Sequence, residues 1–321
     1  MMEYFYEFLL FIGKFISIII FLFLLFGLAR SIKKDPKSGS NQLEIVNLNS
    51  EYSAVKNFML SNMLEKSKIP KKDTNKKKAR FNKNIFVSEF SGDIGATSVK
   101  TLRDEITAIL SVAKENDEVV VILESAGGTV QGYGLGASQL QRIVDAKLKL
   151  TVVVDKIAAS GGYLMACVAN KIVAAPFAII GSIGVVAQLP NFNKILKKNE
   201  VDFEQITAGK YKRTLTLFGE NTDEARAKFQ SDIDRTHDIF KNYVIERRPG
   251  LDIEKVATGE YWQAIHAKEL DLVDELGTSD DIIVSSMKSA NVFKVKKKQK
   301  KSIYKNLFQK AEQILLSFRK F

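Results

Sequence analysis

The chain has 321 residues, 45% of them hydrophobic, and a formal net charge of +11, which is enough apolar side chain for one large domain or two modest ones. A single cysteine, Cys167, excludes an internal disulfide, and two histidines without a CxxC pair argue against the usual zinc site. We therefore expect neither a metal nor a cofactor. The basic residues gather in residues 66–83 and 294–320 with few aromatic residues between them, which argues against a nucleic-acid partner.

The N-terminal residues predict a membrane anchor. Residues 8–28, FLLFIGKFISIIIFLFLLFGL, are long enough to cross a hydrocarbon core of about 30 Å. The segment before them is acidic and no small-residue cleavage site follows, which argues against a cleaved signal peptide. We expect a single-pass transmembrane helix over residues 1–30. Basic residues from Arg30 onward follow the span and none precedes it, which favours the cytoplasmic side for the rest of the chain.

Both segments that flank the central region are basic. Residues 31–84 predict a linker, partly helical over 41–64 and flexible in its lysine-rich part, where like charges oppose packing. This linker is either attracted to acidic lipid headgroups or a solvated spacer. Residues 291–321 predict a basic amphipathic tail, which is either an interfacial membrane helix or a helix that packs on a partner subunit.

Residues 85–290 predict one α/β domain. Residues 118–124 and 150–155 are continuous apolar runs, as expected of buried parallel strands. Segments with apolar residues three and four apart alternate with these runs, which favours a mainly parallel sheet. The other elements we expect are strands at 84–90 and 171–176, and helices at 96–114, at 133–144, from about Ser160, and at 221–247, the last opening with a capping box of Asn221 and Glu224.

Three glycine-containing turns end or follow the predicted strands, at residues 125–128, 159–163 and 181–185. Glycines let backbone N–H groups approach a ligand closely, and such groups can form an oxyanion hole. In the second turn Ser160 opens a helix, where it is either a helix cap or a nucleophile favoured by the helix end. Taken alone, the residues of this turn favour the cap.

A serine nucleophile needs a base, and a lysine is the better candidate here. His237 lies on or beside the apolar face of the long helix, and His266 has no obvious orienting partner, so a Ser-His-Asp triad is poorly supported. Lys212, in ITAGKYKRTLTLFG, lies between apolar stretches and beside a tyrosine, unlike most lysines of the chain. A lysine amine titrates at about 10.4 in water and must be desolvated to act as a base near neutral pH.

Four motifs occur in an order that resembles the signal peptide peptidase A family of serine proteases: ESAGGTV, DKIAASGGYLMACVANKIVAAP, IIGSIGVV and TAGKYKRTLTLFGENT. The resemblance covers most of residues 85–285, together with the N-terminal anchor. It implies the fold shared by the Clp protease and crotonase superfamily. It also implies a serine endopeptidase of the bacterial inner membrane that uses a Ser-Lys dyad.

The resemblance assigns roles by motif match. The nucleophile is Ser160, and the base is Lys212, the second lysine of Gly-Lys-Tyr-Lys, and not Lys210. Ser182 is expected to hydrogen-bond the lysine and hold it in place. In relatives the dyad can be assembled across neighbouring subunits, so we expect a homo-oligomer.

The oxyanion is expected to bind the N–H groups of Gly128 and Gly161. The sequence departs from the family pattern at two places: Ala126 stands where a proline is usual, and Asp271 where a glycine is usual. Neither position supplies chemistry, so the expectation of an enzyme stands.

The expected partners are peptide substrates, membrane lipid and further copies of the chain. Signal-peptide remnants and misfolded membrane-associated proteins are candidate substrates. Relatives that degrade leftover signal peptides can face outward, whereas the charge asymmetry here points inward, so the membrane side stays open. Two alternatives of other classes remain: a non-catalytic membrane-anchored scaffold on the same fold, and a crotonase-like acyl-CoA enzyme.

Overall fold

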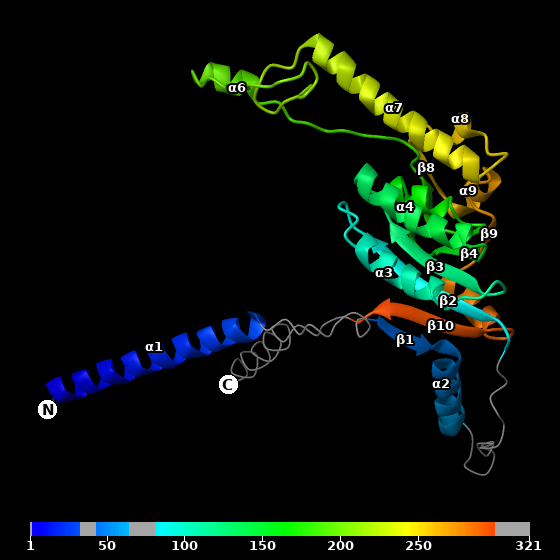
Figure 1. Ribbon diagram of the computed structural model, residues 1–321, viewed down its shortest axis with the longest axis horizontal. Coiled ribbons are helices and arrows are strands. Elements are labelled where there is room, and N and C mark those ends of the chain that lie inside the picture. The colour runs from blue at the N-terminus through cyan, green and yellow to red at the C-terminus, as the bar shows by residue number, and fades with distance from the viewer. Residues whose placement is uncertain (1, 33–42, 64–80, 299–321) are drawn as a thin grey trace. The chain divides into compact units, whose positions relative to one another are not determined.

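The computed structural model describes residues 2–32, 43–63 and 81–298 (Figure 1). The chain divides into two compact units, residues 1–42 and residues 43–321. The lysine-rich part of the predicted linker and the predicted tail beyond residue 298 lie outside the described residues.

Helix α1 (Met2–Ile32) makes up the described part of the first unit. Within it, Tyr6–Phe23 is long and apolar enough to cross a membrane, and none of this stretch is buried inside the protein. An apolar helix therefore stands where the sequence predicts one.

The described part of the second unit is built on one mixed, mostly parallel sheet. Its strands are β1 (Leu43–Asn47), β2 (Asn84–Gly92), β3 (Glu118–Ser125), β4 (Lys149–Val154), β5 (Ile157–Ala159), β6 (Lys171–Ala174), β7 (Ile179–Gly181), β8 (Tyr261–Gln263), β9 (Glu275–Leu276) and β10 (Asn291–Lys297). The main path runs β1-β10-β2-β3-β4-β6-β9, while β5, β7 and β8 continue from the end of β3. Among the described pairs, β1–β10 and β7–β8 are antiparallel and the others parallel. The predicted α/β fold with a mainly parallel sheet is thus confirmed.

Helices cover both faces of this sheet. The described helices of this unit are α2 (Leu48–Met63), α3 (Val99–Leu110), α4 (Val130–Asp145), α5 (Gly161–Ala166), α6 (Asn193–Lys198), α7 (Asp223–Arg247), α8 (Ile253–Val256), α9 (Ala264–Glu269) and α10 (Ser279–Ser286). Side chains of α3, α4 and α5 pack on one face, and α10 packs on the other. Each face of the sheet carries its own hydrophobic core, a larger one with α3, α4 and α5 and a smaller one with α10. Alternate residues of β3 contribute to both: Val119 and Val121 lie in the larger core, and Val120 lies in the smaller one. Burial on both faces explains the continuous apolar runs of the central strands.

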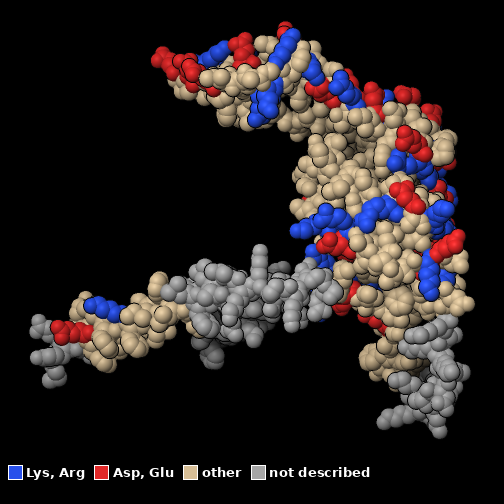
Figure 2. Space-filling model, in the orientation of Figure 1, with Lys and Arg blue, Asp and Glu red and all other residues tan. Residues whose placement is uncertain are grey.

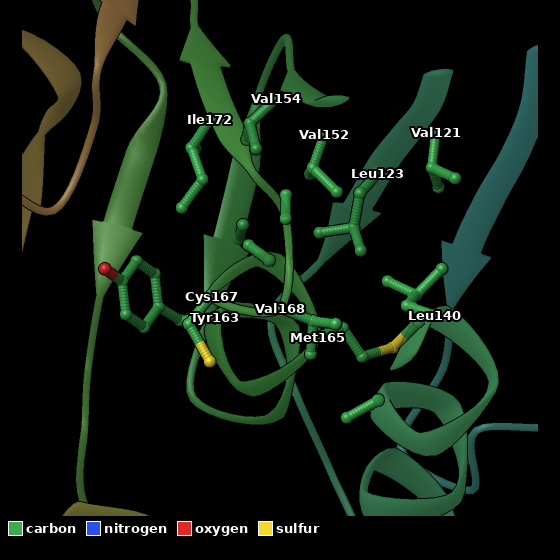
Figure 3. Close-up of a cluster of buried hydrophobic side chains, with 14 of the residues drawn as sticks. Val121, Leu123, Leu140, Val152, Val154, Tyr163, Met165, Cys167, Val168 and Ile172 are labelled. Atoms are coloured by element: carbon green, nitrogen blue, oxygen red, sulfur yellow. The ribbon is translucent and has the colours of Figure 1, made fainter. Parts of the chain in front are cut away.

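The larger core lies directly beneath the candidate site. Figure 3 shows strand side chains such as Leu123 and Val152 gathered with Leu140 of α4 and Met165 of α5. All four are fully buried. The short helix α5 is therefore held against the sheet by its own apolar residues, which fixes where the residue before it lies.

Strand β10 lies within the segment that the sequence assigned to the tail, and β1 lies within the predicted linker. The two strands pair with each other, and β10 also pairs with β2. Val292 and Val295 are buried, while Lys294 reaches Glu89 at 2.6 Å. Strand β10 is thus an interior strand between β1 and β2, and the sheet includes residues 291–297 of the segment that the sequence assigned to the tail. Its other lysines also reach carboxylates of neighbouring elements, Lys296 with Glu44 at 3.6 Å and Lys297 with Asp104 at 3.3 Å. The number of lysines hid this strand in the sequence.

The predicted capping of the long helix by Asn221 is wrong. Helix α7 is capped by Thr222, whose Oγ1 accepts a hydrogen bond from the Ala225 amide at 3.2 Å. Asn221 instead accepts from the Thr216 amide at 2.9 Å. The amide side chain stabilises the preceding turn, so it is not free to cap the helix.

A buried carboxyl joins three elements of the domain. Ser88 of β2 donates to Glu105 of α3 at 2.5 Å, and the amide of Lys297 in β10 donates to the same carboxyl at 3.0 Å. Burial raises the pKa of Glu105 more than these two hydrogen bonds lower it. The folded chain therefore keeps this proton at pH values where the unfolded chain has released it.

Glu105→Gln should change how stability depends on pH. Because the folded pKa is raised, the wild-type free energy of unfolding falls as pH rises from the ordinary carboxyl pKa, about 4, through the folded value. The variant cannot titrate there, so its stability should increase relative to wild type across that window. Thermal unfolding of the full-length proteins at several pH values measures this, with Glu115→Gln, at an exposed carboxyl, as the control. Parallel curves for wild type and Glu105→Gln would contradict it.

Candidate functional site

Two serines directly follow the ends of β5 and β7, which are neighbouring parallel strands that end side by side. Ala159, the last residue of β5, pairs with Gly181, the last residue of β7, and the Ser160 amide donates to the Gly181 carbonyl at 2.8 Å. Ser160 and Ser182 directly follow this pair, and both have φ of 51°. Left-handed backbone is costly for a residue with a Cβ and recurs at functional sites. The sheet therefore places the expected nucleophile and the expected lysine-orienting serine side by side.

Ser160 does not act as the helix cap that its turn alone favoured. It stands at the N-cap position of α5, but its ψ is −119° and its side chain accepts no hydrogen bond from the helix amides. The hydroxyl is therefore left for another role. Cys167, at the other end of α5, is fully buried, and burial raises its pKa to about 12, so its thiol stays protonated and is a poor nucleophile.

Ser160 lines an apolar cavity of about 220 Å³. The expected oxyanion residues Gly128 and Gly161 line the same cavity. Helix α7 supplies a further part of the wall, which the sequence did not assign to the site. The other lining residues are Val130, Tyr133, Gly134, Leu164, Gly184, Val185, Val186, Thr236, Ile239, Phe240 and Tyr243.

The Gly-Gly turn packs directly against the nucleophile. Gly127 has φ of +92°, and a Cβ built on it would lie 2.8 Å from both Ser160 Cβ and the Gly161 nitrogen. The Gly127 amide donates to Ser125 Oγ at 3.0 Å. Within residues 43–63 and 81–298, the amides of Gly128 and Gly161 have no such acceptor. Two residues whose N–H groups have no acceptor in the described part of the chain thus line the cavity that Ser160 lines.

Lys212 is not brought to the cavity of its own chain. It is exposed, lies in an irregular stretch before α7, and is absent from the cavity lining. Lys210 makes an ion pair with Glu224 at 2.7 Å, and the hydrogen bond from that pair raises its pKa. No ion pair of Lys212 occurs among the described residues. Of the two lysines, Lys210 is the one that an ion pair holds in its charged form.

The segment that carries Lys212, residues 186–222, forms an arm beyond the body of the domain (Figures 1 and 2). It is held together internally: the Phe218 ring contacts those of Phe192 and Phe203 at a tilt, with ring centroids 6.0 and 5.7 Å apart. It also exposes large apolar side chains: Val186, Leu189, Phe192, Ile195, Val201, Phe203, Ile206, Tyr211, Leu217 and Phe218. Long connections of this kind in compact domains are uncommon and usually functional.

The histidines are not at the candidate site. Neither His237 nor His266 lines the cavity, and His266 lies 3.7 Å from Glu269 on the surface. The Nε2 of His237 is buried without a partner among the described residues. The absence of a histidine beside Ser160 agrees with the weak sequence support for a triad.

The fold and the site define a serine-type peptidase, and comparison with known proteins places it in a family. Residues 142–293 match the profile described as "Peptidase family S49", and residues 3–140 match "Peptidase family S49 N-terminal". The chain belongs to peptidase family S49, which confirms the resemblance to the signal peptide peptidase A family.

Two relatives are similar over almost the whole chain. "Probable protease SohB" of Haemophilus influenzae is 45% identical, over 95% of this chain and 92% of the relative. "Probable protease SohB" of Buchnera aphidicola subsp. Schlechtendalia chinensis is 48% identical, over 88% of this chain and all of the relative.

Gly127→Ala should abolish peptidase activity while leaving the domain folded. The new Cβ would meet Ser160 and Gly161, and the left-handed φ would be strained as well. Displacing the turn by about 1 Å should lower kcat/KM roughly 100-fold or more. Peptide hydrolysis by purified protein measures this effect.

Gly250→Ala is the matched control. Gly250 has φ of +98°, but a Cβ there meets nothing within 4 Å. It adds the same backbone strain far from Ser160, so it should cost stability and leave kcat/KM near the wild-type value. Equal losses in the two variants would show that strain, and not contact with the nucleophile, explains the effect.

Proposed function

We propose that this chain is a membrane-anchored serine endopeptidase that cleaves peptides through an acyl-enzyme on Ser160. The observation that supports this most strongly is the setting of Ser160 itself. It has a positive φ and lies on the wall of an apolar cavity that Gly128 and Gly161 also line. A strained serine beside two free amides is what acyl transfer needs.

In the proposed mechanism, the neutral amine of Lys212 removes the proton from Ser160 Oγ as Oγ attacks the peptide carbonyl. The amides of Gly128 and Gly161 bind the oxyanion of the tetrahedral intermediate. The intermediate collapses, and the leaving amine takes the proton from the lysine ammonium. Water, deprotonated by the same lysine, then attacks the acyl-enzyme. As the second tetrahedral intermediate collapses, the lysine ammonium returns its proton to Ser160 Oγ and the carboxylic acid is released. Ser182 would hold the lysine through a hydrogen bond.

We further propose that the lysine comes from a neighbouring copy in a homo-oligomer. In the single chain Lys212 is exposed on the arm, and none of residues 201–222 lines the cavity. The arm exposes apolar side chains of the kind that interfaces bury. Docking the arm on another copy would remove the amine from water and lower the cost of keeping it neutral.

The cavity wall suggests the substrate class. Its side chains are mostly aliphatic or aromatic, such as Leu164, Val186 and Ile239. A cavity of this composition suits one hydrophobic side chain of an extended peptide. Signal-peptide remnants and misfolded membrane-associated proteins carry such segments.

Ser160→Ala and Lys212→Met should each abolish cleavage of a hydrophobic peptide, because one removes the nucleophile and the other the base. If the dyad forms between copies, co-expressing the two inactive variants should restore activity. Random mixing gives about a quarter of wild-type sites, since each site then needs a serine from one copy and a lysine from its neighbour. Hydrolysis by the purified mixed oligomer measures this.

Lys210→Met is the matched control for the lysine and should remain active. A chain carrying both Ser160→Ala and Lys212→Met, co-expressed with either single variant, should stay inactive. Wild-type-like cleavage by Ser160→Ala or Lys212→Met would remove the dyad. Inactivity of the mixed oligomer, with both single variants inactive, would place both groups in one chain.

The proposal places the enzyme in the bacterial inner membrane, with α1 as a single-pass anchor. The full chain should stay in the membrane fraction after alkaline carbonate extraction, and a chain lacking residues 1–30 should be released. Because basic residues follow the span, the peptidase domain should resist protease added to intact spheroplasts and be digested only after lysis. Digestion in intact spheroplasts would place the domain on the outer side.

A further inference from the structure

We propose that Tyr133 and Ser125 are positioning residues that hold the two amides of the oxyanion hole in register, an inference that rests on the proposed function. Neither residue carries chemistry in the mechanism above. Both are buried; Ser125 accepts a hydrogen bond from the Gly127 amide, and Tyr133 lies within hydrogen-bond distance of Ser125.

A continuous chain of hydrogen bonds runs from the Gly-Gly turn to the end of β2. The Gly127 amide donates to Ser125 Oγ at 3.0 Å, Ser125 Oγ lies 2.5 Å from Tyr133 Oη, and Tyr133 donates to the Asp93 carbonyl at 2.8 Å. Ser125 Oγ also lies 3.5 Å from the Gly92 carbonyl, so either hydroxyl of the pair has an acceptor when the other donates to it. In both arrangements Ser125 Oγ accepts from the Gly127 amide, and every donor in the chain has an acceptor.

This chain decides which amide remains available. The Gly127 N–H is occupied by Ser125, whereas the following N–H, that of Gly128, has no acceptor among the described residues, and Gly128 lines the cavity. Ala126 and Gly127 restrict the backbone only weakly, so local sequence does not hold the turn in this orientation. The hydrogen bond to Ser125 holds it on one side, and the bond from the Thr129 amide to the Ile94 carbonyl at 2.9 Å holds it on the other.

The other half of the oxyanion hole rests on the same tyrosine. The ring of Tyr133 packs against Gly161 so closely that a Cβ on Gly161 would overlap its atoms. One side chain thus touches Gly161 directly and reaches the Gly127–Gly128 turn through Ser125. The spacing between the two oxyanion amides therefore depends on where Tyr133 lies.

Tyr133 itself has little freedom to move. Its ring meets Phe90 edge-on, with centroids 6.4 Å apart and planes at 83°. A Cβ on Gly92 would overlap the Tyr133 hydroxyl and lie 2.6 Å from Ser125 Oγ. The absence of a side chain at Gly92 makes room for the hydroxyl pair. Burial raises the pKa of Tyr133, so its proton stays in place.

The test compares Tyr133→Phe and Ser125→Ala, which break the chain at successive links, with their double variant. Each single variant should lower kcat about 10- to 100-fold with KM changed less than about twofold, because ground-state binding does not use the oxyanion amides. Affinity for a peptide boronate, which mimics the tetrahedral intermediate, should fall in parallel. The double variant should lose no more than the worse single one, because the links act as one unit.

Tyr163→Phe is the matched control. Tyr163 is also fully buried, and its hydroxyl donates to the Leu272 carbonyl at 3.1 Å, away from the cavity lining. It should lose stability as a buried tyrosine does, with kcat and boronate affinity unchanged.

The outcomes distinguish a failure of the positioning role from a failure of the proposed peptidase function. If Tyr133→Phe and Ser125→Ala both keep kcat and boronate affinity within twofold of Tyr163→Phe, the positioning role is overturned while the peptidase stands. Losses that multiply in the double variant would also overturn it, because the residues would then act independently. If Tyr133→Phe does not fold, Ser125→Ala alone decides by the same criterion. Wild-type-like activity of Ser160→Ala would instead overturn the proposed function.

Discussion

The pairing of Ala159 with Gly181 is the constraint on which the candidate site depends. Because β5 and β7 end together in a parallel pair, the chain must turn out of the sheet at both following residues, Ser160 and Ser182. The hydrogen bond from the Ser160 amide to the Gly181 carbonyl closes the turn and leaves both serines with positive φ. The buried apolar residues of α5 also hold the turn at Ser160 in place. A strained residue persists only where its surroundings over-determine it, and here the sheet and the core both do.

The other parts of the candidate site differ in how deeply they are buried. The serine, the glycine amides and much of the cavity wall belong to the packed domain, whereas Lys212 lies on an exposed arm. The proposed chemistry needs a neutral amine, and an amine surrounded by water is charged. An arm that becomes buried only on association would make the base competent only in the oligomer. Activity would then be linked to assembly, which limits cleavage by stray single chains.

Glycines allow the backbone segments of the site to pack closely together, and buried polar groups hold these segments in one conformation. Gly127 and Gly161 lie so near Ser160 and Tyr133 that side chains at either position would displace them. The same lack of side chains leaves the turn without local preference, so its orientation must come from hydrogen bonds. Ser125 and Tyr133 supply these in a fully satisfied chain, which is how buried polar groups specify one conformation without an unpaired donor.

The sequence by itself determined the α/β class, because continuous apolar runs such as 118–124 are legible without tertiary information. Motif order was sufficient to indicate the family. The sequence did not reveal β10, an interior strand between β1 and β2 whose many lysines favoured a tail, nor the Thr222 cap, since Asn221 bonds back to Thr216. Taken alone, the turn at Ser160 favoured a helix cap, and the pattern placed Tyr133 only on a buried helical face. Only the tertiary structure showed that Ser160 makes no capping hydrogen bond, that α7 forms part of the cavity wall and that Tyr133 packs against Gly161, because these features arise from contacts between elements distant in the chain.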